Sequence, residues 1–331
     1  KAGSLYAYAN PSVPSNTLFT SVDGGYSWSS TGDVEDSIVG IATAPDDASI
    51  IFYATASGVY KSADSGNSFT PLPPGPGGAG SGNITITSID VVRLSGKSLI
   101  AIGTVDNDNL QYGGVYTLDE SDLIPAWQNT ALGNYDVSAV TISPNYAADQ
   151  QLLAVTTNET DTFVTCKIGT GGWNQTIGRG TIAGRSARAS TIAFPTDYDI
   201  SSGNFTLFTA IDTGSNNGDV YKIKGGWTPD NSTVTDLNIG AADNLTNMDV
   251  TGLAVAGSSP AVKLLAGAAN STRVYISTDS GANWTRGSKE PTGQSKTYLL
   301  MSPDFASTGV AYAATTGIDS AFSYTADGGL T

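Results

Sequence analysis

Acidic side chains in turns are the residues of this sequence whose type and spacing can support chemistry. Two carboxyl groups on either side of a glycosidic bond are enough to hydrolyse it, one as acid and the other as base or nucleophile. The acids in Gly-, Ser- and Pro-containing segments are Asp33, Glu35, Asp36, Asp46, Asp47, Asp106, Asp108, Asp197 and Asp199. The sequence fixes no distance between any two of them, and Asp is common in turns for structural reasons, so solvated turn acids are the favoured interpretation.

Composition excludes several other kinds of catalytic and metal site. The chain has no His and one Cys, Cys166. Ser-His-Asp and Cys-His catalysis, His-ligated metals and an imidazole pH switch all need a histidine. Cys166 follows the alternating run Phe163-Val164-Thr165, which predicts a small buried apolar side chain. We therefore expect no cofactor.

One acidic segment partly matches a calcium-binding loop. Asp106-Asn107-Asp108-Asn109 offers side-chain oxygens of the kind that Ca²⁺ binds. The Gly and the distal Glu of such a loop are missing at their usual offsets. The segment predicts at most a weakly bound Ca²⁺.

A short motif of acid, glycine and aromatic residue occurs four times. Its pattern is Ser/Thr-x-Asp-x-Gly-x-x-aromatic, at 21–28, 62–69 and 277–284, and again from Thr325, where the sequence stops one residue before the aromatic position. The Asp accepts backbone N–H bonds, the Gly permits a positive φ, and the aromatic residue folds back over the hairpin. These roles are structural, and they are assigned to Asp23, Gly25, Trp28, Asp64, Gly66, Phe69, Asp279, Gly281, Trp284, Asp327 and Gly329.

The segments around these motifs read as β-strands. Runs such as Ile51–Thr55 and Val310–Ala314 precede them, and Gly, Asn, Asp and Pro separate the runs. These runs and motifs divide the chain into seven units, at approximately 5–28, 37–72, 86–130, 137–176, 189–233, 250–288 and 297–331. A pitch of about 40 to 50 residues is that of a four-stranded propeller blade. We predict an all-β fold, a β-propeller of about seven four-stranded blades in one domain spanning residues 1–331. We expect the first unit to lack its innermost strand and the last unit to lack its outermost strand. Either these two units together form one shared blade, or the chain continues beyond Thr331.

The repeated motifs resemble the Asp-box, or BNR, repeat of the sialidase-like β-propeller superfamily. The resemblance covers the whole chain as an architecture and rests mainly on the four motifs. The superfamily includes sialidases, xyloglucan-cleaving glycosidases, photosystem-assembly propellers, sortilin-type receptors and bacterial or archaeal surface proteins. The resemblance therefore implies the fold and leaves the function open.

The arginines argue against a sialidase. The resemblance would imply three arginines that grip a substrate carboxylate from separate blades. The chain has six, Arg93, Arg179, Arg185, Arg188, Arg273 and Arg286, of which three crowd into one loop at 179–188. Aromatic residues that can stack on sugars, Tyr112, Trp127, Trp173 and Trp227, lie at or beside motif aromatic positions, so core packing explains most of them.

Charge and glycosylation signals favour an exported protein. The formal charge is −15, from 15 basic and 30 acidic residues, which disfavours nucleic acid and anionic lipid as partners. No apolar run reaches the roughly 18 residues of a membrane span. Candidate N-glycosylation sites, Asn-x-Ser/Thr, occur at Asn83, Asn158, Asn174, Asn204, Asn231, Asn244, Asn270 and Asn283.

Together these features predict a non-enzymatic, extracellular structural or adhesive protein. We expect a self-assembling, glycosylated surface-layer, sheath or filament subunit, whose partners are copies of itself and glycans. One alternative is a carbohydrate-active propeller, either a glycoside hydrolase or lectin-like. The other is a receptor or assembly-factor propeller that binds a protein partner.

Overall fold

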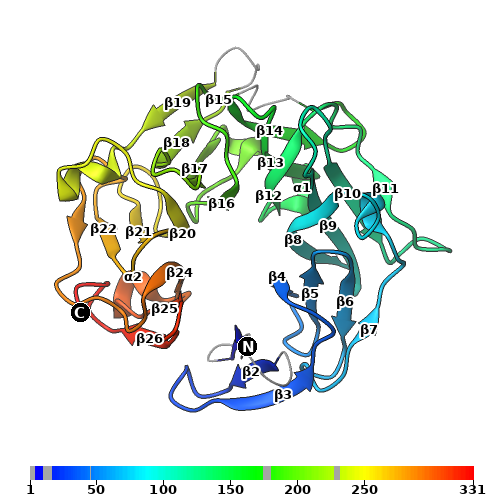
Figure 1. The fold of residues 1–331 in the computed structure, drawn as a ribbon, viewed down its shortest axis with the longest axis horizontal. Helices are drawn as coiled ribbons and strands as arrows, with labels where there is room; N and C mark the ends of the chain where they lie inside the picture. Colours follow the sequence, from blue (N-terminus) through cyan, green and yellow to red (C-terminus); the bar gives the residue numbers. More distant parts are fainter. Residues whose placement is uncertain (1–3, 10–16, 45, 174–179, 227–231) are drawn as a thin grey trace. The chain divides into compact units, whose positions relative to one another are not determined.

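The computed structural model of the chain describes residues 4–9, 17–44, 46–173, 180–226 and 232–331. The fold is an all-β, seven-bladed β-propeller of antiparallel sheets (Figure 1), which confirms the predicted fold class. Five sheets have four strands, and the first and the last have three in the described residues. Helices are short: α1 (Tyr146–Asp149), α2 (Phe305–Thr308), and the 3₁₀ turns η1 (Pro76–Gly78), η2 (Ile200–Ser202) and η4 (Ile239–Asp243).

The chain divides into two compact units, Lys1–Ala154 and Val155–Thr331, so the expectation of one domain stays a prediction. In the first unit each sheet follows chain order. The sheets are β1 (Leu5–Ala9), β2 (Thr17–Ser21) and β3 (Ser29–Asp33); β4 (Ile38–Thr43), β5 (Ile51–Thr55), β6 (Val59–Ser62) and β7 (Thr70–Pro71); and β8 (Ile84–Leu94), β9 (Lys97–Asp106), β10 (Gly114–Asp119) and β11 (Gln128–Asn129). The fourth sheet begins with β12 (Asp136–Ile142), and the division falls inside its second strand, β13 (Gln151–Thr157).

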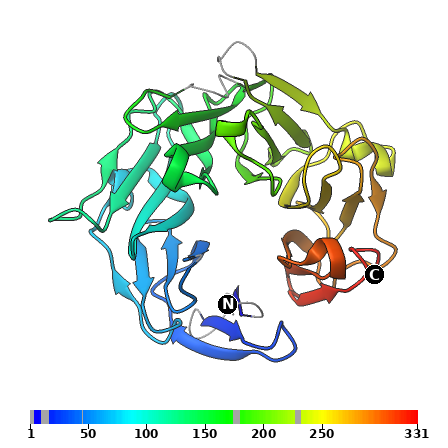
Figure 2. The same ribbon diagram turned by 180° about the vertical axis from the view of Figure 1, so that it is seen from behind.

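The second unit continues with the same strand order, which Figure 2 shows from behind. It holds β14 (Thr162–Ile168) and β15 (Gly180–Ile182); β16 (Ala189–Ala193), β17 (Thr206–Asp212), β18 (Val220–Lys224) and β19 (Thr233–Asp236); β20 (Val250–Ala256), β21 (Lys263–Ala268), β22 (Val274–Ser277) and β23 (Thr285–Arg286); and β24 (Ser295–Met301), β25 (Ala311–Thr316) and β26 (Phe322–Thr325).

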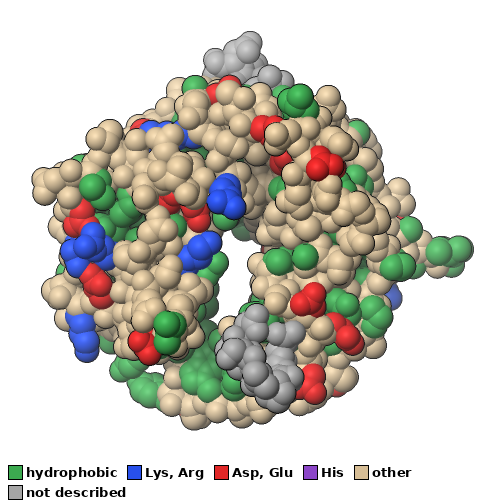
Figure 3. All heavy atoms as spheres, viewed as in Figure 1, with side chains coloured by type: hydrophobic (Ala, Val, Ile, Leu, Met, Phe, Trp, Pro, Cys, Tyr) green, Lys and Arg blue, Asp and Glu red, His purple; other side chains and the backbone are tan. Residues whose placement is uncertain are grey.

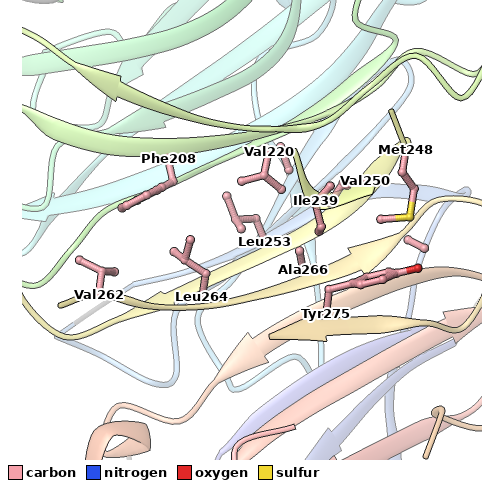
Figure 4. Packing of buried hydrophobic residues seen from close by; sticks show 12 residues of the cluster. Phe208, Val220, Ile239, Met248, Val250, Leu253, Val262, Leu264, Ala266 and Tyr275 are labelled. Atoms are coloured by element: carbon pink, nitrogen blue, oxygen red, sulfur yellow. The ribbon is translucent and has the colours of Figure 1, made fainter. Parts of the chain in front are cut away.

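Middle strands are buried on both faces because each lies between two neighbouring sheets. All five residues of β5 are buried, as are all seven of β17. Figure 4 shows one such layer, in which Phe208 and Val220 of the fifth sheet pack against Leu264 and Tyr275 of the sixth. Each fully buried large apolar side chain contributes about 1.5–3 kcal/mol, so these layers hold the sheets together within a unit.

Position relative to the motif shows which strands the two three-stranded sheets contain. In the second sheet the motif joins the third strand, β6, to the fourth, β7, and in the first sheet it joins β2 to β3. The first sheet therefore holds the equivalents of strands two to four. In the seventh sheet the motif follows β26, so that sheet holds strands one to three.

Threonine hydroxyls link the first strands of neighbouring sheets. Thr191 of β16 donates to the carbonyl oxygen of Thr251 in β20 at 3.0 Å, and Thr251 donates to that of Thr297 in β24 at 3.3 Å. Thr87 of β8 similarly donates to the Val137 carbonyl oxygen of β12 at 2.5 Å. A strand carbonyl has two lone pairs, so it can accept this second bond without loss of the sheet ladder.

Candidate functional site

The four motifs form closely similar hairpins, here called the acidic hairpins: Ser21–Trp28, Ser62–Phe69, Ser277–Trp284 and Thr325–Thr331. In the second, the Ser62 hydroxyl donates to Asp64 Oδ1 at 2.7 Å and accepts from the Gly66 N–H at 2.8 Å. Ser65 and Gly66 have φ values of 62° and 88°, the left-handed region that Gly adopts without strain. The predicted Asp and Gly residues of all four hairpins take these positions.

A second donor in each hairpin was missed in the sequence pattern. Four residues after the Asp, a side chain donates to its other oxygen: Ser27, Ser68, Asn283 and Thr331, at 2.6, 2.6, 2.7 and 2.5 Å. The backbone N–H of the same residue donates to Oδ1. Both oxygens of each carboxylate are therefore occupied by the hairpin itself.

These hydrogen bonds stabilise the ionised carboxylates. Donation from the Ser27 and Ser68 side chains, followed by their backbone N–H groups, lowers the pKa of Asp23 and of Asp64 to about 2. The Thr331 hydroxyl leads the same effect on the pKa of Asp327, also about 2, and Asn283 lowers the pKa of Asp279. Such acids are poor proton donors at neutral pH.

Most of the turn acids considered for glycoside hydrolysis form hydrogen bonds or ion pairs with nearby residues. Asp46 and Asp47 both contact Arg93, at 3.7 and 3.1 Å. Others cap turns: Asp36 accepts from Ser37 N, Asp106 from Asp108 N, Asp199 from Ser201 N, and Asp197 from Ser259 N. Asp33 and Glu35 lie at and just after the end of β3, and Asp108 accepts from the Gln111 side chain at 3.5 Å. Among the described turn acids, Asp46 and Asp47 share one arginine, Arg93.

The predicted weak calcium segment has no supporting cluster. Within the described part of the chain, no group of three or more His, Cys, Asp or Glu side chains is arranged to hold a metal ion. Nor does any described helix have the length and apolar character needed to cross a membrane.

Most of the described arginines form ion pairs with acids. Arg185 lies 3.4 Å from Asp236, and Arg273 lies 2.6 Å from Asp243. Arg286 contacts Asp243 at 3.8 Å and also pairs with Glu290. Arg179 lies outside the described residues. The second unit therefore holds an arginine and acid network in which Arg273 and Arg286 share their partners.

Two acids not singled out from the sequence hold loops of the preceding sheet. Asp136 accepts from the N–H groups of Asp106 and Gly113, both at 2.9 Å. Asp249 accepts from the N–H groups of Thr213, Asn216 and Gly218 at 2.7–3.0 Å. Each of these acids directly precedes a Val near the start of the first strand of its own sheet. The two segments are Tyr135-Asp136-Val137 and Met248-Asp249-Val250, and this shared pattern is visible in the sequence.

Asp219 is a buried carboxyl group whose pKa is strongly raised. It is fully buried, and its Oδ1 accepts from the N–H groups of Val220 and Ile239 at 2.8 and 2.9 Å. Its Oδ2 has no hydrogen-bond partner among the described residues. Burial raises its pKa to about 7, and the nearby charge of Asp236 adds to the shift. An aspartate with this pKa is partly protonated at neutral pH.

The candidate glycosylation sites differ in what their side chains do. Asn83, Asn244 and Asn270 are exposed, and Asn158 and Asn204 are half-buried. The Nδ2 groups of Asn204, Asn270 and Asn283 donate to Asp197 O, Asn216 Oδ1 and Asp279 Oδ2. Asn174 and Asn231 lie outside the described residues. The Asn283 sequon thus coincides with a hairpin position that demands a donor side chain.

The third sheet replaces the acidic hairpin with a longer loop, here called the 119–127 loop. Trp127 follows Asp119 by eight positions, whereas Trp28 follows Asp23 by five. The added residues expose Leu123 and Ile124, at 99% and 82%. The loop projects between β10 and β11 in Figure 1, and hydrophobic side chains stand out at its tip in Figure 3.

The base of the 119–127 loop is firmly held. Asp119 Oδ1 accepts from Ser121 N at 2.7 Å, and the Trp127 indole donates to the Pro73 carbonyl oxygen at 2.8 Å. Glu120 accepts from Ser98 N at 3.1 Å and pairs with Lys61. The loop therefore presents an exposed apolar tip on an anchored base.

Each unit has a cavity. In the first unit, a cavity of about 300 Å³ is lined mainly by hydroxyl and small side chains of the first two sheets, with no carboxylate. In the second unit, a cavity of about 130 Å³ lies between the sixth and seventh sheets, and Glu290 is its one lining carboxylate. Neither of these two cavities has the carboxylate pair that glycoside hydrolysis requires.

The chain matches no protein-family model and no curated protein, but it is similar to solved propeller structures. YCF48 from Cyanidioschyzon merolae has a TM-score of 0.58 at 13% identity, over 93% of this chain and 88% of that one. A YCF48 bound to D1 peptide has a TM-score of 0.53 at 17% identity, over 90% and 82%. An α-L-arabinanase from Penicillium chrysogenum, complexed with arabinobiose, has a TM-score of 0.49 at 9% identity, over 87% and 92%. The chain therefore has the sialidase-like propeller fold.

The comparisons correct the main functional expectation. The two similar structures with TM-scores of 0.58 and 0.53 are both YCF48, one of them bound to D1 peptide, and neither is named as a subunit of a layer, sheath or filament. The prediction of a self-assembling structural subunit is therefore wrong. It relied on the composition and the sequons of the chain, which are equally compatible with a propeller that binds another molecule. The two alternatives, a carbohydrate-active propeller and a protein-binding one, fit better.

Proposed function

We propose that this chain is a non-enzymatic propeller that binds a protein partner, with the 119–127 loop as its docking element. The observation that carries the proposal is the near-complete exposure of Leu123 and Ile124 at the tip of that loop. Large apolar side chains that protrude together are a feature of interaction sites, and burying each against a partner is worth about 1.5–3 kcal/mol.

The anchored base supports the same proposal. Asp119 and Trp127 fix both ends of the loop, so little conformational entropy is lost when the tip is buried. Asp122 directly precedes the tip in the sequence, and Asp119 and Glu120 lie at the base of the same loop. The partner is therefore expected to offer an apolar groove with a basic rim.

Two further observations favour binding over hydrolysis. These two cavities contain no carboxylate pair, and most of the described turn acids form local hydrogen bonds or ion pairs. A propeller of similar fold, YCF48, has been solved bound to D1 peptide.

Location and repeat family are part of the proposal. We assign the acidic hairpins to the Asp-box repeat on their shared Asp, Gly and aromatic positions. We also propose an extracellular, glycosylated protein, with glycans on exposed sequons such as Asn83 and Asn270. Peptide mapping of native material by mass spectrometry tests this, and unmodified asparagines at every sequon would contradict it.

A peptide array compares the wild type with two variants. Leu123→Ser/Ile124→Ser removes the docking tip, whereas Val22→Ser/Tyr26→Ser removes two side chains that are each 77% exposed on an acidic hairpin. We expect the wild type and the second variant to bind the same apolar, basic peptides, and the first variant to lose them. Equal binding by all three proteins would rule out the loop as the docking element. Specific glycan turnover, abolished by changing one carboxylate, would establish the hydrolase instead.

A further inference from the structure

A buried acid and its neighbours form a polar cluster on the fifth sheet. Asp219 directly precedes β18, and the ladder with β17 continues through it, because its carbonyl oxygen accepts from Ile211 N at 3.0 Å. Tyr221 follows two residues later, so the side chains of Asp219 and Tyr221 lie on the same face of the sheet. Asp236 of β19 is the residue paired with Tyr221. Asp219, Tyr221 and Asp236 are therefore close together.

Arg185 reaches this cluster from the fourth sheet, where β15 lies beside β19 of the fifth (Figure 1). Its guanidinium donates to the Tyr221 hydroxyl and to Asn247 Oδ1, the latter at 2.8 Å, and lies 3.4 Å from Asp236 Oδ2. The backbone is held separately, because the Thr162 hydroxyl donates to the Arg185 carbonyl oxygen at 2.6 Å. A change of partners by the cation therefore requires only a rotation of the Arg185 side chain.

The Asp219 carboxyl group is arranged for its neutral form. The side chain is fully buried, and its Oδ2 has no hydrogen-bond partner among the described residues. Burial is the main cause that raises the pKa of Asp219 to about 7, and the charge of Asp236 adds to the shift. The positive charge of Arg185 acts in the opposite direction. Asp236 and Arg185 are thus the charged groups that influence this acid from the neighbouring strand and from the neighbouring sheet.

Ionisation of Asp219 changes which acid Arg185 stabilises more. A buried carboxylate oxygen that lacks a donor or a cation is costly, whereas an ion pair exposed to water contributes little. The side chain of Asp236 is 33% exposed, and that of Asp219 is buried. Asp236 also keeps another donor, because its Oδ1 accepts from Asn238 N at 2.9 Å. Arg185 therefore stabilises an ionised Asp219 more than it stabilises Asp236.

We propose that Asp219 and Arg185 form a proton-operated switch between the fourth and fifth sheets, in which the Arg185 side chain holds Asp236 and Asn247 while Asp219 is neutral and rotates to Asp219 Oδ2 when Asp219 ionises. The proton passes to solvent. The Asp236 carboxylate then loses its cation, so the surface beside β19 becomes more acidic as the pH rises through neutrality. The switch shares no residue with the 119–127 loop, so each proposal can fail without the other.

An NMR titration of the wild type from about pH 5 to about pH 9 tests the switch. We expect the carboxyl carbon of Asp219 to titrate near pH 7. The Arg185 guanidinium signals and the Asp236 carboxyl carbon should change with the same midpoint, because one rotation alters both environments. Arg185 signals that stay constant across this range, or an Asp236 signal without a transition near pH 7, would overturn the proposal.

Three variants connect these signals. Asp219→Asn cannot ionise, so the transition near pH 7 should disappear from the Arg185 and Asp236 signals. Asp319→Asn makes the same chemical change on an exposed loop and should leave both transitions in place. Arg185→Gln removes the cation and should raise the Asp219 midpoint by roughly one pH unit.

Two results with these variants would contradict the switch. One is a transition near pH 7 that persists in the Arg185 signals of Asp219→Asn. The other is an Asp219 midpoint that Arg185→Gln leaves unchanged. The wild-type titration decides by itself if either variant does not fold.

Discussion

Asn283 Nδ2 donates to Asp279 Oδ2 at 2.7 Å, in the position where Ser27 and Ser68 use a hydroxyl in their own hairpins. An amide and a hydroxyl are thus interchangeable at this position, because the carboxylate needs only a donor within reach. The Asn283 sequon is then explained by hairpin structure alone, without a glycan.

Asn283→Ser is therefore expected to leave the thermal midpoint nearly unchanged, while Asn283→Ala lowers it, because Asp279 Oδ2 loses its side-chain donor. Differential scanning calorimetry of both variants measures the difference. Equal midpoints for the Ser and Ala variants would show that this hydrogen bond does not stabilise the hairpin.

The acidic hairpins should lose stability only at strongly acidic pH. The pKa values of Asp23, Asp64 and Asp327 are lowered to about 2, below the roughly 3.9 of an unfolded aspartate. Their stabilising contribution is thus complete above about pH 4 and is lost as the pH falls through about 2. Carboxyl carbon chemical shifts, followed by NMR, should titrate near pH 2 for these residues; midpoints near 4 would contradict the hydrogen-bond assignment.

Asp219 should have the opposite effect on the pH dependence of stability. Its folded pKa of about 7 lies above the unfolded value, so its contribution to stability falls as the pH rises from about 4 to about 7. Asp219→Asn keeps the Oδ1 acceptor for Val220 and Ile239 but cannot ionise. We expect the variant to gain up to about 4 kcal/mol relative to wild type between pH 4 and pH 8, measured by urea unfolding. Parallel pH profiles for the two proteins would refute the burial argument.

Trp284 should matter far more than an exposed aromatic residue of another hairpin. Trp284→Ala opens the layer between the fifth and sixth sheets and should cost about 3 kcal/mol. Tyr26→Ala, at a side chain that is 77% exposed, should change stability by no more than about 0.5 kcal/mol. Urea unfolding of both variants provides the comparison, and similar losses would contradict the packing role of Trp284.

The docking tip should be dispensable for folding. Leu123 and Ile124 make little contact with the rest of the chain, so Leu123→Ser/Ile124→Ser should change the free energy of unfolding by no more than about 0.5 kcal/mol. A loss of several kcal/mol, again by urea unfolding, would mean that the tip packs within the protein and is not a docking element.

The fold could be predicted because its signals are local and repeated. Alternating apolar runs and the spacing from Asp64 to Phe69 recur at a blade-sized pitch, and each repetition strengthens the same interpretation. The hairpin acids were found for this reason, whereas Ser68 and Asn283 were missed because two different donor types occupy one position.

The candidate site depends on departures from the repeat, which a search for similarity overlooks. The 119–127 loop does not match the motif pattern, and the exposure of Leu123 and Ile124 on its three added residues is a property of the folded chain. Asp219 looks like an ordinary turn acid, because burial and an unpartnered oxygen are properties of the folded chain. The cavity between the sixth and seventh sheets is likewise a property of how the folded side chains pack.

The hydroxyl bonds from Thr191 to Thr251 and from Thr251 to Thr297 make three sheets of the second unit consecutive members of one linked series. A pulling force applied to β24 is transmitted to β20 and then to β16 through these transverse bonds as well as through the buried layers. The three sheets should therefore yield together under mechanical load, as a single rupture event, and replacing the Thr251 hydroxyl by a Val methyl would separate that event into smaller ones.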